Sequence, residues 1–212
     1  VSVAIPCRDK VKTNNNTEQR TRIQYIAKAS DDLKLVTHFE MNTRWGVEYS
    51  SASPGVNASG GGDIDTDSNN LLVKHAYLDF NMGKSLNFKL GQQAYKDTLK
   101  GLYVDADLPM AYMTAKAGAY TLGLGYSRFT DTDTSLTGKT FSGNRSADLY
   151  AIDNTFALSK DTKLGMSYYL NVDDAGRTAN AVGGPVGQAK RVHTLGLFGQ
   201  TKMGDLNLSG FA

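Results

Sequence analysis

Residues 71–93, LLVKHAYLDFNMGKSLNFKLGQQ, carry the clearest strand pattern in this chain. Apolar residues occupy every second position in both of its halves, as Leu86, Phe88 and Leu90 do in the second. A period of two places the apolar set on one face of an extended strand and the polar set on the other. Because Met82-Gly83-Lys84 forms a tight turn at the centre, the two halves are predicted to pair as an antiparallel hairpin.

The same hairpin pattern recurs along the chain and predicts about ten strands of the length that crosses a bilayer when tilted. Turns of a few residues alternate with long connections. The predicted strands cover residues 20–29, 33–45, 71–80, 86–93, 110–117, 120–129, 147–158, 162–172, 192–201 and 206–211. The long connections are expected at about 46–70, 94–109, 130–146 and 173–190, after an irregular segment at 1–17.

Composition limits the alternatives. A length of 212 residues suits one all-β domain, and a net charge of +2 gives no basic footprint for nucleic acid. High glycine, 22 residues, together with 11 Tyr and 8 Phe favours a sheet or barrel over helices. The single cysteine, Cys7, cannot form an internal disulfide, and no window approaches the roughly 18 apolar residues of a spanning helix.

The regular alternation of short and long connections predicts the architecture. In an antiparallel series it places every tight turn at one end of the strands and every long connection at the other, as in barrels of the outer membrane. Aromatic residues near the ends of the apolar faces fit an aromatic girdle. The fold class expected is therefore all-β, an up-and-down transmembrane β-barrel forming a single domain. A soluble β-sandwich or solenoid remains the alternative.

Three segments resemble Gram-negative outer-membrane porins, above all the porins of metal-reducing deltaproteobacteria: RTRIQYIAKASDDLKLVTHFEMNTRWG at 20–46, VKHAYLDF at 73–80 and LNFKLGQQ at 86–93. The resemblance extends from about Glu18 onward. It implies a barrel of about 16–18 strands, commonly trimeric, around an aqueous channel. The chain has fewer strands than that and stops at Phe211-Ala212 in mid-strand, so it is expected to be part of a larger barrel, or else to close at ten strands.

If the apolar faces meet lipid, the polar faces line the channel. Mixed charge on such a wall selects solutes by charge and dipole. The alternative is a solvated face whose cross-strand pairs contribute at most about 1 kcal/mol each. The predicted pore-lining residues are Arg20, Arg22, Gln24, Lys28, Lys34, His38, Glu40, Arg44, His75, Asp79, Lys89 and Gln93.

The connection at 94–109 is a candidate constriction loop, since a porin loop that folds inward narrows the channel. An acidic loop would favour cations, and the alternative is an ordinary external loop. Its candidate residues are Lys96, Asp97, Lys100, Asp105 and Asp107. The alternating Asp63, Asp65 and Asp67 lack the glycine and closing glutamate of an EF-hand loop, so no metal site and no cofactor are predicted.

The predicted function is a water-filled diffusion channel for small hydrophilic solutes or ions in the bacterial outer membrane. The expected partners are membrane lipid, lipopolysaccharide and further copies of the chain in a trimer. No GxSxG, HExxH or P-loop motif occurs, and His38, His75 and His193 lie on separate strands, so catalysis is not expected. Two alternatives remain. One is a non-conducting barrel that anchors or sheaths a partner, such as a secreted electron carrier, against the small residues Gly123, Gly125, Gly165 and Gly196; the other is a soluble β-domain acting as a binding module.

Overall fold

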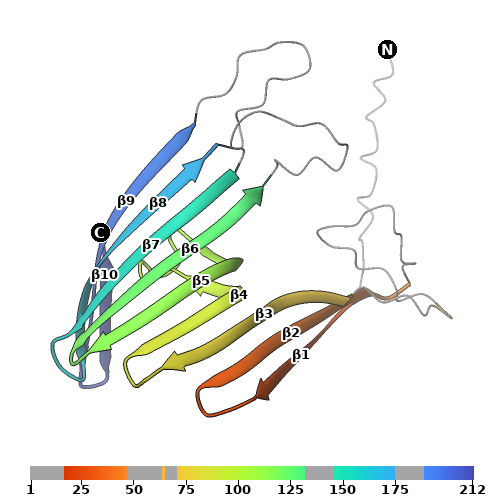
Figure 1. Ribbon diagram of the computed structural model, residues 1–212, viewed down its shortest axis with the longest axis horizontal. Helices are drawn as coiled ribbons and strands as arrows, with labels where there is room; N and C mark the ends of the chain where they lie inside the picture. Colours follow the sequence, from red (N-terminus) through yellow and green to blue (C-terminus); the bar gives the residue numbers. More distant parts are fainter. Residues whose placement is uncertain (1–16, 47–63, 65–70, 132–145, 175–188) are drawn as a thin grey trace, which may run out of the picture. The chain divides into compact units, whose positions relative to one another are not determined.

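The computed structural model describes residues 17–46, 64, 71–131, 146–174 and 189–212. These residues form one antiparallel sheet in which each strand pairs with the next in the chain (Figure 1). The strands are β1 (Glu18–Lys28), β2 (Leu33–Arg44), β3 (Leu71–Met82), β4 (Leu86–Lys96), β5 (Asp105–Ala117), β6 (Tyr120–Asp131), β7 (Ser146–Ala157), β8 (Thr162–Asp173), β9 (Lys190–Met203) and β10 (Leu206–Phe211).

The prediction of an all-β, up-and-down antiparallel fold is confirmed, and the described part of the chain contains no helix. The pairings run from β1 to β10 as an open series, so the described strands do not close into a barrel. Within the same residues, no helix long and apolar enough to cross a bilayer is found. All of the predicted segment at 1–17 except Thr17, and most of the connections at 46–70, 130–146 and 173–190, fall outside the described residues, as do Asp63, Asp65 and Asp67.

The chain divides into two compact units. The first consists of residues 1–23 and 39–72, and it contains the part of the first hairpin that lies far from its turn. The second consists of residues 24–38 and 73–212, and it contains that turn and almost all of the remaining strands.

All five tight turns belong to the second unit and lie at one end of its strands (Figure 1). Three have a glycine with positive φ, for example Gly83 at +67° and Gly118 at +59°. An added Cβ there would meet nothing within 4 Å, so the requirement is conformational, because L-residues with a side chain rarely adopt this region. The turn between β1 and β2 is closed by Ala29 N–H donating to the Leu33 carbonyl at 2.9 Å.

The connection between β4 and β5 is shorter than predicted. It spans residues 97–104 instead of 94–109. The pairing of β4 with β5 continues through residues 94–96 and 105–109, where the sequence lacks the alternation of apolar and polar residues that predicts a strand. Lys96 pairs with Asp105 in register, and their side chains form an ion pair at 2.8 Å. Pro109 lies within β5 opposite Gln92. Cross-strand pairing therefore overrides the low strand propensity of this stretch.

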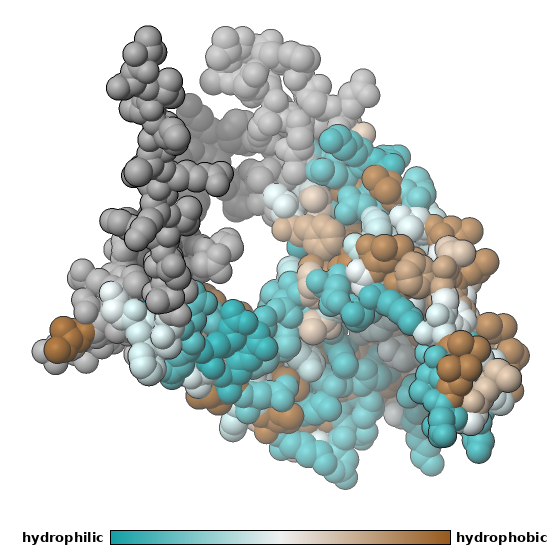
Figure 2. Space-filling view, turned by 180° about the vertical axis from the view of Figure 1, so that it is seen from behind, coloured by the Kyte–Doolittle hydropathy of each residue, from teal (hydrophilic) through white to brown (hydrophobic). Residues whose placement is uncertain are grey.

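The sheet of the second unit has two faces of different character. The apolar face contains cross-strand rows such as Leu124, Ile152, Tyr168 and Leu195, with Leu195 65 % exposed. Figure 2 shows hydrophobic residues gathered over the last strands of this unit. Strand alternation assigns the neighbouring row, Gly123, Asp153, Ser167 and Gly196, to the opposite face.

This opposite face, called the packed face here, carries the hydrophobic core. Leu149 and Tyr169 are fully buried on it. The connection at 97–104 contributes to the same core through Leu99, with Tyr103 and Val104 packed against it. The sheet thus buries apolar side chains on the face that the connection covers and exposes them on the other. The core residues are Tyr95, Leu99, Leu108, Met110, Leu149, Ala151 and Tyr169.

Candidate functional site

The first unit positions a charged cluster between β1 and β2. Glu40, only 6 % exposed, accepts from Arg22 Nε at 2.6 Å and from Asn42 Nδ2 at 2.9 Å. Arg20 Nε donates to Asn42 Oδ1 at 2.7 Å and lies 3.6 Å from Glu40 Oε1. Alternate residues on two paired strands share a face, which explains why these four side chains meet. Three of the predicted pore-lining residues are therefore brought together.

A second charged cluster lies on β2–β4 of the second unit. Asp79 binds Lys34 Nζ at 3.2 Å and Asn87 Nδ2 at 2.7 Å. Lys89 pairs in register with Asp79, and its Nζ lies 6.0 Å from the centroid of the Tyr77 ring. A polar hollow of 330 Å³ opens beside this cluster, lined by Lys28, Ser30, Asp31, Asp32, Leu33, Lys34, Asp79, Asn81 and Asn87.

Two of the three histidines meet although their strands are separate in sequence. His38 Nδ1 on β2 lies 3.3 Å from His75 Nδ1 on β3. His75 Nε2 lies 2.9 Å from Asp107 Oδ1, and Lys74 Nζ binds the other oxygen of that carboxylate at 2.8 Å. Asp107 was predicted in the constriction loop. That prediction is wrong, because Asp107 belongs to β5, where it pairs with Ala94, and its carboxylate binds residues of β3.

The remaining predicted pore-lining residues differ in how exposed their side chains are. Gln24 is exposed, and Lys28 binds Asp31 at 2.8 Å beside the first turn. Arg44 is half-buried near the end of β2. Gln93 is only 4 % exposed, and its Nε2 donates to the carbonyl of Met110 at 2.8 Å. The side chain of Gln93 therefore links β4 to β5 by a buried hydrogen bond on the packed face.

The connection at 97–104 is folded around Asp97. Its carboxylate is buried and accepts backbone N–H groups of Gly101 at 2.8 Å, Tyr103 at 2.7 Å and Val104 at 2.5 Å. A buried carboxylate that receives three backbone donors holds a loop in one conformation. Asp97 therefore points its charge at its own loop. Asp105, also predicted in the loop, lies in β5 and pairs with Lys96.

This connection, here the inner loop (residues 97–104), crosses the packed face as far as the last strands. Thr98 Oγ1 lies 2.5 Å from Ser167 Oγ and 3.1 Å from the Tyr169 hydroxyl on β8. The rings of Tyr103 and Tyr169 stack with centroids 5.3 Å apart. Leu99 contacts β9, and Lys100 Nζ donates to the hydroxyl of Ser209 on β10. The loop predicted as a candidate constriction thus packs against the sheet.

Under the loop lies a polar centre that the sequence reasoning missed. Asp153 is 5 % exposed and accepts hydroxyls from Tyr95 at 3.1 Å, Tyr112 at 2.9 Å and Tyr169 at 2.7 Å. These residues come from β4, β5, β7 and β8. The sequence did contain one indication of this centre. Asp153 pairs in register with Gly123 and Ser167, and these two small residues leave room beside its carboxylate for tyrosine side chains from other strands.

The four glycines proposed to accommodate a sheathed partner do lie on the packed face. At each of them an added Cβ would collide with a side chain of this same chain. The space left by the missing side chains is therefore already filled. The occupying residues are Tyr112 at Gly123, Met110 at Gly125, Phe198 at Gly165 and Leu99 at Gly196.

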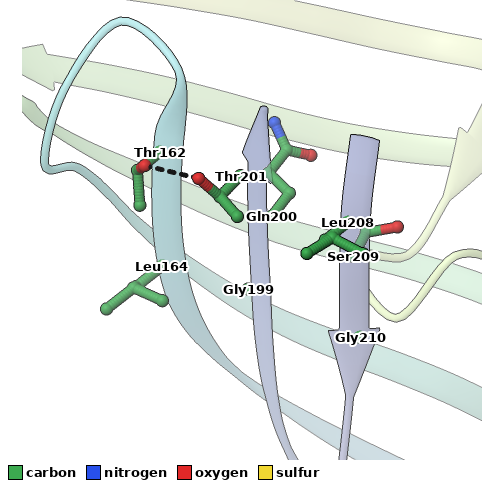
Figure 3. A pocket seen from close by; sticks show the side chains of 8 residues that line it. All are labelled: Thr162, Leu164, Gly199, Gln200, Thr201, Leu208, Ser209 and Gly210. Carbon is green, nitrogen blue, oxygen red and sulfur yellow. Dashed lines mark hydrogen bonds between the residues drawn. The ribbon is translucent and has the colours of Figure 1, made fainter. Parts of the chain in front are cut away.

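A separate hollow of 390 Å³ lies at β8–β10, next to the hydrogen bond of 2.8 Å between Thr162 and Thr201 (Figure 3). Gly199 and Gly210 pair in register there, and because neither has a side chain, the backbone of the sheet forms part of the surface of the hollow. No titratable side chain lines the hollow, and it shares no residue with the charged clusters. Its lining residues are Thr162, Leu164, Gly199, Gln200, Thr201, Leu208, Ser209 and Gly210.

Comparison of the chain with protein-family models finds no matching family, and comparison with curated proteins finds no matching relative.

Proposed function

We propose that this chain forms part of the wall of an outer-membrane channel, a porin-type barrel that passes small hydrophilic solutes or ions by diffusion. The proposal is a passive channel without catalytic activity. The observation that carries it is the banded arrangement of the apolar face on β6 and β7.

Aromatic rows bound this band on both sides. Tyr120 pairs with Phe156 beside the tight turns, and Tyr126 pairs with Tyr150 farther along the strands. Six residues of strand separate the two rows, which corresponds to about 20 Å. Arg128 and Asp148 form an ion pair at 2.8 Å immediately beyond the second row. An apolar band about 25 Å tall between aromatic girdles is typical of barrels in the outer membrane.

The interior of the band is apolar and exposed. Leu124 and Ile152 pair at its centre, and the one amide there, on Asn154, binds the Tyr120 hydroxyl and the Met166 carbonyl. A soluble sandwich would cover such a face with a second sheet. The described strands form one sheet, and Ile23 and Tyr25 on the first hairpin are more than half exposed. This exposure supports lipid contact over a soluble binding module.

The charged clusters support the proposal that the polar side chains line a water-filled channel. Cations and carboxylates alternate on neighbouring strands, as in Lys34, Asp79 and Lys89. Such a lining selects solutes by charge. The inner loop, held by Asp97, supports a fixed constriction, and its exposed charged side chain is that of Lys100.

Closure and assembly belong to the same proposal. Among the described strands, β1 and β10 each pair along one edge only, and backbone groups left unpaired in lipid are costly. We therefore propose that further strands complete a barrel of about 16–18 strands, the size typical of porins. Lipopolysaccharide around the barrel and assembly as a trimer follow from the resemblance to porins.

Conductance across a planar bilayer tests the proposal. The refolded full-length barrel, this chain together with the further strands proposed above, is expected to give discrete, stable steps, with an ion selectivity that shifts in Glu40→Gln and in Arg22→Gln. Asp31→Asn is the control, because it removes an exposed charge at a tight turn. A protein that inserts, resists heat in detergent and conducts nothing would contradict the channel.

That negative outcome would favour the second candidate, a non-conducting barrel that anchors a partner. The observation in its favour is the inner loop, which covers the packed face from β4 to β10. Against a sheathed partner stands the filling of the four glycine sites by side chains of the chain itself.

A further inference from the structure

His38 and His75 meet through the same ring nitrogen, Nδ1. The two Nδ1 atoms are 3.3 Å apart, a distance that a hydrogen bond from one ring to the other satisfies when no ion is bound. The ring centroids lie 5.0 Å apart, with an interplanar angle of 59°. Both residues belong to the second unit, on the neighbouring strands β2 and β3 (Figure 1).

The surroundings of His75 fix which of its nitrogens carries the proton. Its Nε2 lies 2.9 Å from a carboxylate oxygen of Asp107, so Nε2 is the donor. A neutral His75 then presents a lone pair on Nδ1, toward His38. A carboxylate behind the far nitrogen is the arrangement that orients metal-binding histidines and raises their basicity. Lys74 holds the second oxygen of the same carboxylate at 2.8 Å, which fixes the direction of Asp107.

We propose that His38 and His75 bind one divalent transition-metal ion through their Nδ1 atoms. Two imidazole nitrogens at about 2.0–2.1 Å from a tetrahedral ion are about 3.3–3.4 Å apart, which matches the observed separation. The rings also diverge as two ligands of one ion must, since their centroids are farther apart than their Nδ1 atoms. The site therefore needs no rearrangement of the strands.

The donor set selects the kind of ion. Imidazole nitrogen suits Zn²⁺, Cu²⁺ and Ni²⁺, whereas Ca²⁺ and Mg²⁺ require oxygen ligands. Within the described residues no group of three His, Cys, Asp or Glu side chains is placed to hold a metal ion. The bound ion thus keeps open positions for water or a passing anionic solute. Such an ion is exchangeable, unlike a structural zinc with four protein ligands.

The test is binding of Zn²⁺ alone to the refolded chain in detergent, followed by calorimetry and by ¹⁵N shifts of labelled histidines. We expect one ion per chain, with both Nδ1 resonances of His38 and His75 shifting together. Calorimetry of His38→Gln and of His75→Gln is expected to show at least tenfold weaker binding. Asp107→Asn, which weakens the orienting carboxylate, is expected to weaken binding by about 10–100-fold while leaving the ligands in place.

His193 is the matched control. Its Nδ1 lies 2.6 Å from the Tyr168 hydroxyl on β8–β9, and His193→Gln is expected to bind Zn²⁺ as tightly as the parent. Far-ultraviolet circular dichroism confirms that each variant is folded before titration. Parent binding no tighter than that of folded His75→Gln, or a shift of His193 alone, would overturn the proposal. Because the measurement does not depend on conduction, it separates this site from the channel function.

Discussion

The charged clusters of β1–β4 and the packed face of β4–β9 both follow from side chains that alternate along strands, yet they hold polar groups in opposite ways. In the clusters, Arg22 and Lys34 stay partly exposed while they pair with carboxylates. On the packed face, Asp153 is buried and receives three tyrosine hydroxyls. Polar residues on paired strands can thus present charge to solvent in one region and hold a buried hydrogen-bond centre together in another.

The largest effect is expected on the packed face, from Asp153→Ala. It leaves three tyrosine hydroxyls without their shared acceptor, and unsatisfied buried groups cost about 1–3 kcal/mol each. We expect the free energy of unfolding in detergent to fall by about 3 kcal/mol or more, as measured by denaturant titration. Asp161→Ala is the control, because Asp161 is exposed in the β7–β8 turn and its weak pair with Lys160 spans 4.0 Å. Equal midpoints for the two variants would show that the tyrosine centre does not stabilise the fold.

The next effect concerns the apolar face. Leu124→Arg places a charge between the two aromatic rows, and in a membrane barrel such a charge costs about 2–4 kcal/mol near the bilayer midplane. Leu158→Arg makes the same substitution just beyond β7, where the expected cost is about 0–1 kcal/mol. Equilibrium unfolding from lipid vesicles measures both. A band that does not face lipid would give similar values for the two variants.

A smaller effect tests whether the inner loop rests on β9. In Gly196→Val the new side chain would enter the space of Leu99, since even a Cβ would lie 2.5 Å from Leu99 Cδ1. Overpacking of this kind costs about 1–3 kcal/mol. In the double variant with Leu99→Ala, the added cost of Gly196→Val is expected to shrink, and a double-mutant cycle of unfolding energies measures the coupling. Additive costs would place Leu99 away from β9.

Alternation was sufficient to predict the ten strands and the tight turns between them, apart from the end of β4 and the start of β5. Residues such as Leu86, Phe88 and Leu90 encode these features locally, because one strand displays its own period of two. The pair formed by Arg22 and Glu40 also follows from a single hairpin, since the short turn fixes the register of its strands.

The packed face could not be predicted in the same way. Tyr95 and Asp153 are 58 positions apart in sequence, and their contact depends on how the intervening strands twist and how the inner loop folds over them. The contact of His38 with His75 spans 37 positions, with a long connection between them. The start of β5 was missed because the pairing of Lys96 with Asp105 is a property of two strands together.

The smallest effect on stability is expected in the charged clusters. Arg22→Gln removes the guanidinium 2.6 Å from Glu40, but Asn42 and Arg20 remain beside that carboxylate. Arg22 is half exposed, so its pair is screened by solvent, and we expect the free energy of unfolding to fall by at most about 1 kcal/mol. The same variant should nevertheless change ion selectivity, because the net charge of the wall becomes more negative. A loss of stability as large as that of Asp153→Ala, with unchanged selectivity, would show that this cluster holds the first hairpin together and does not serve permeation.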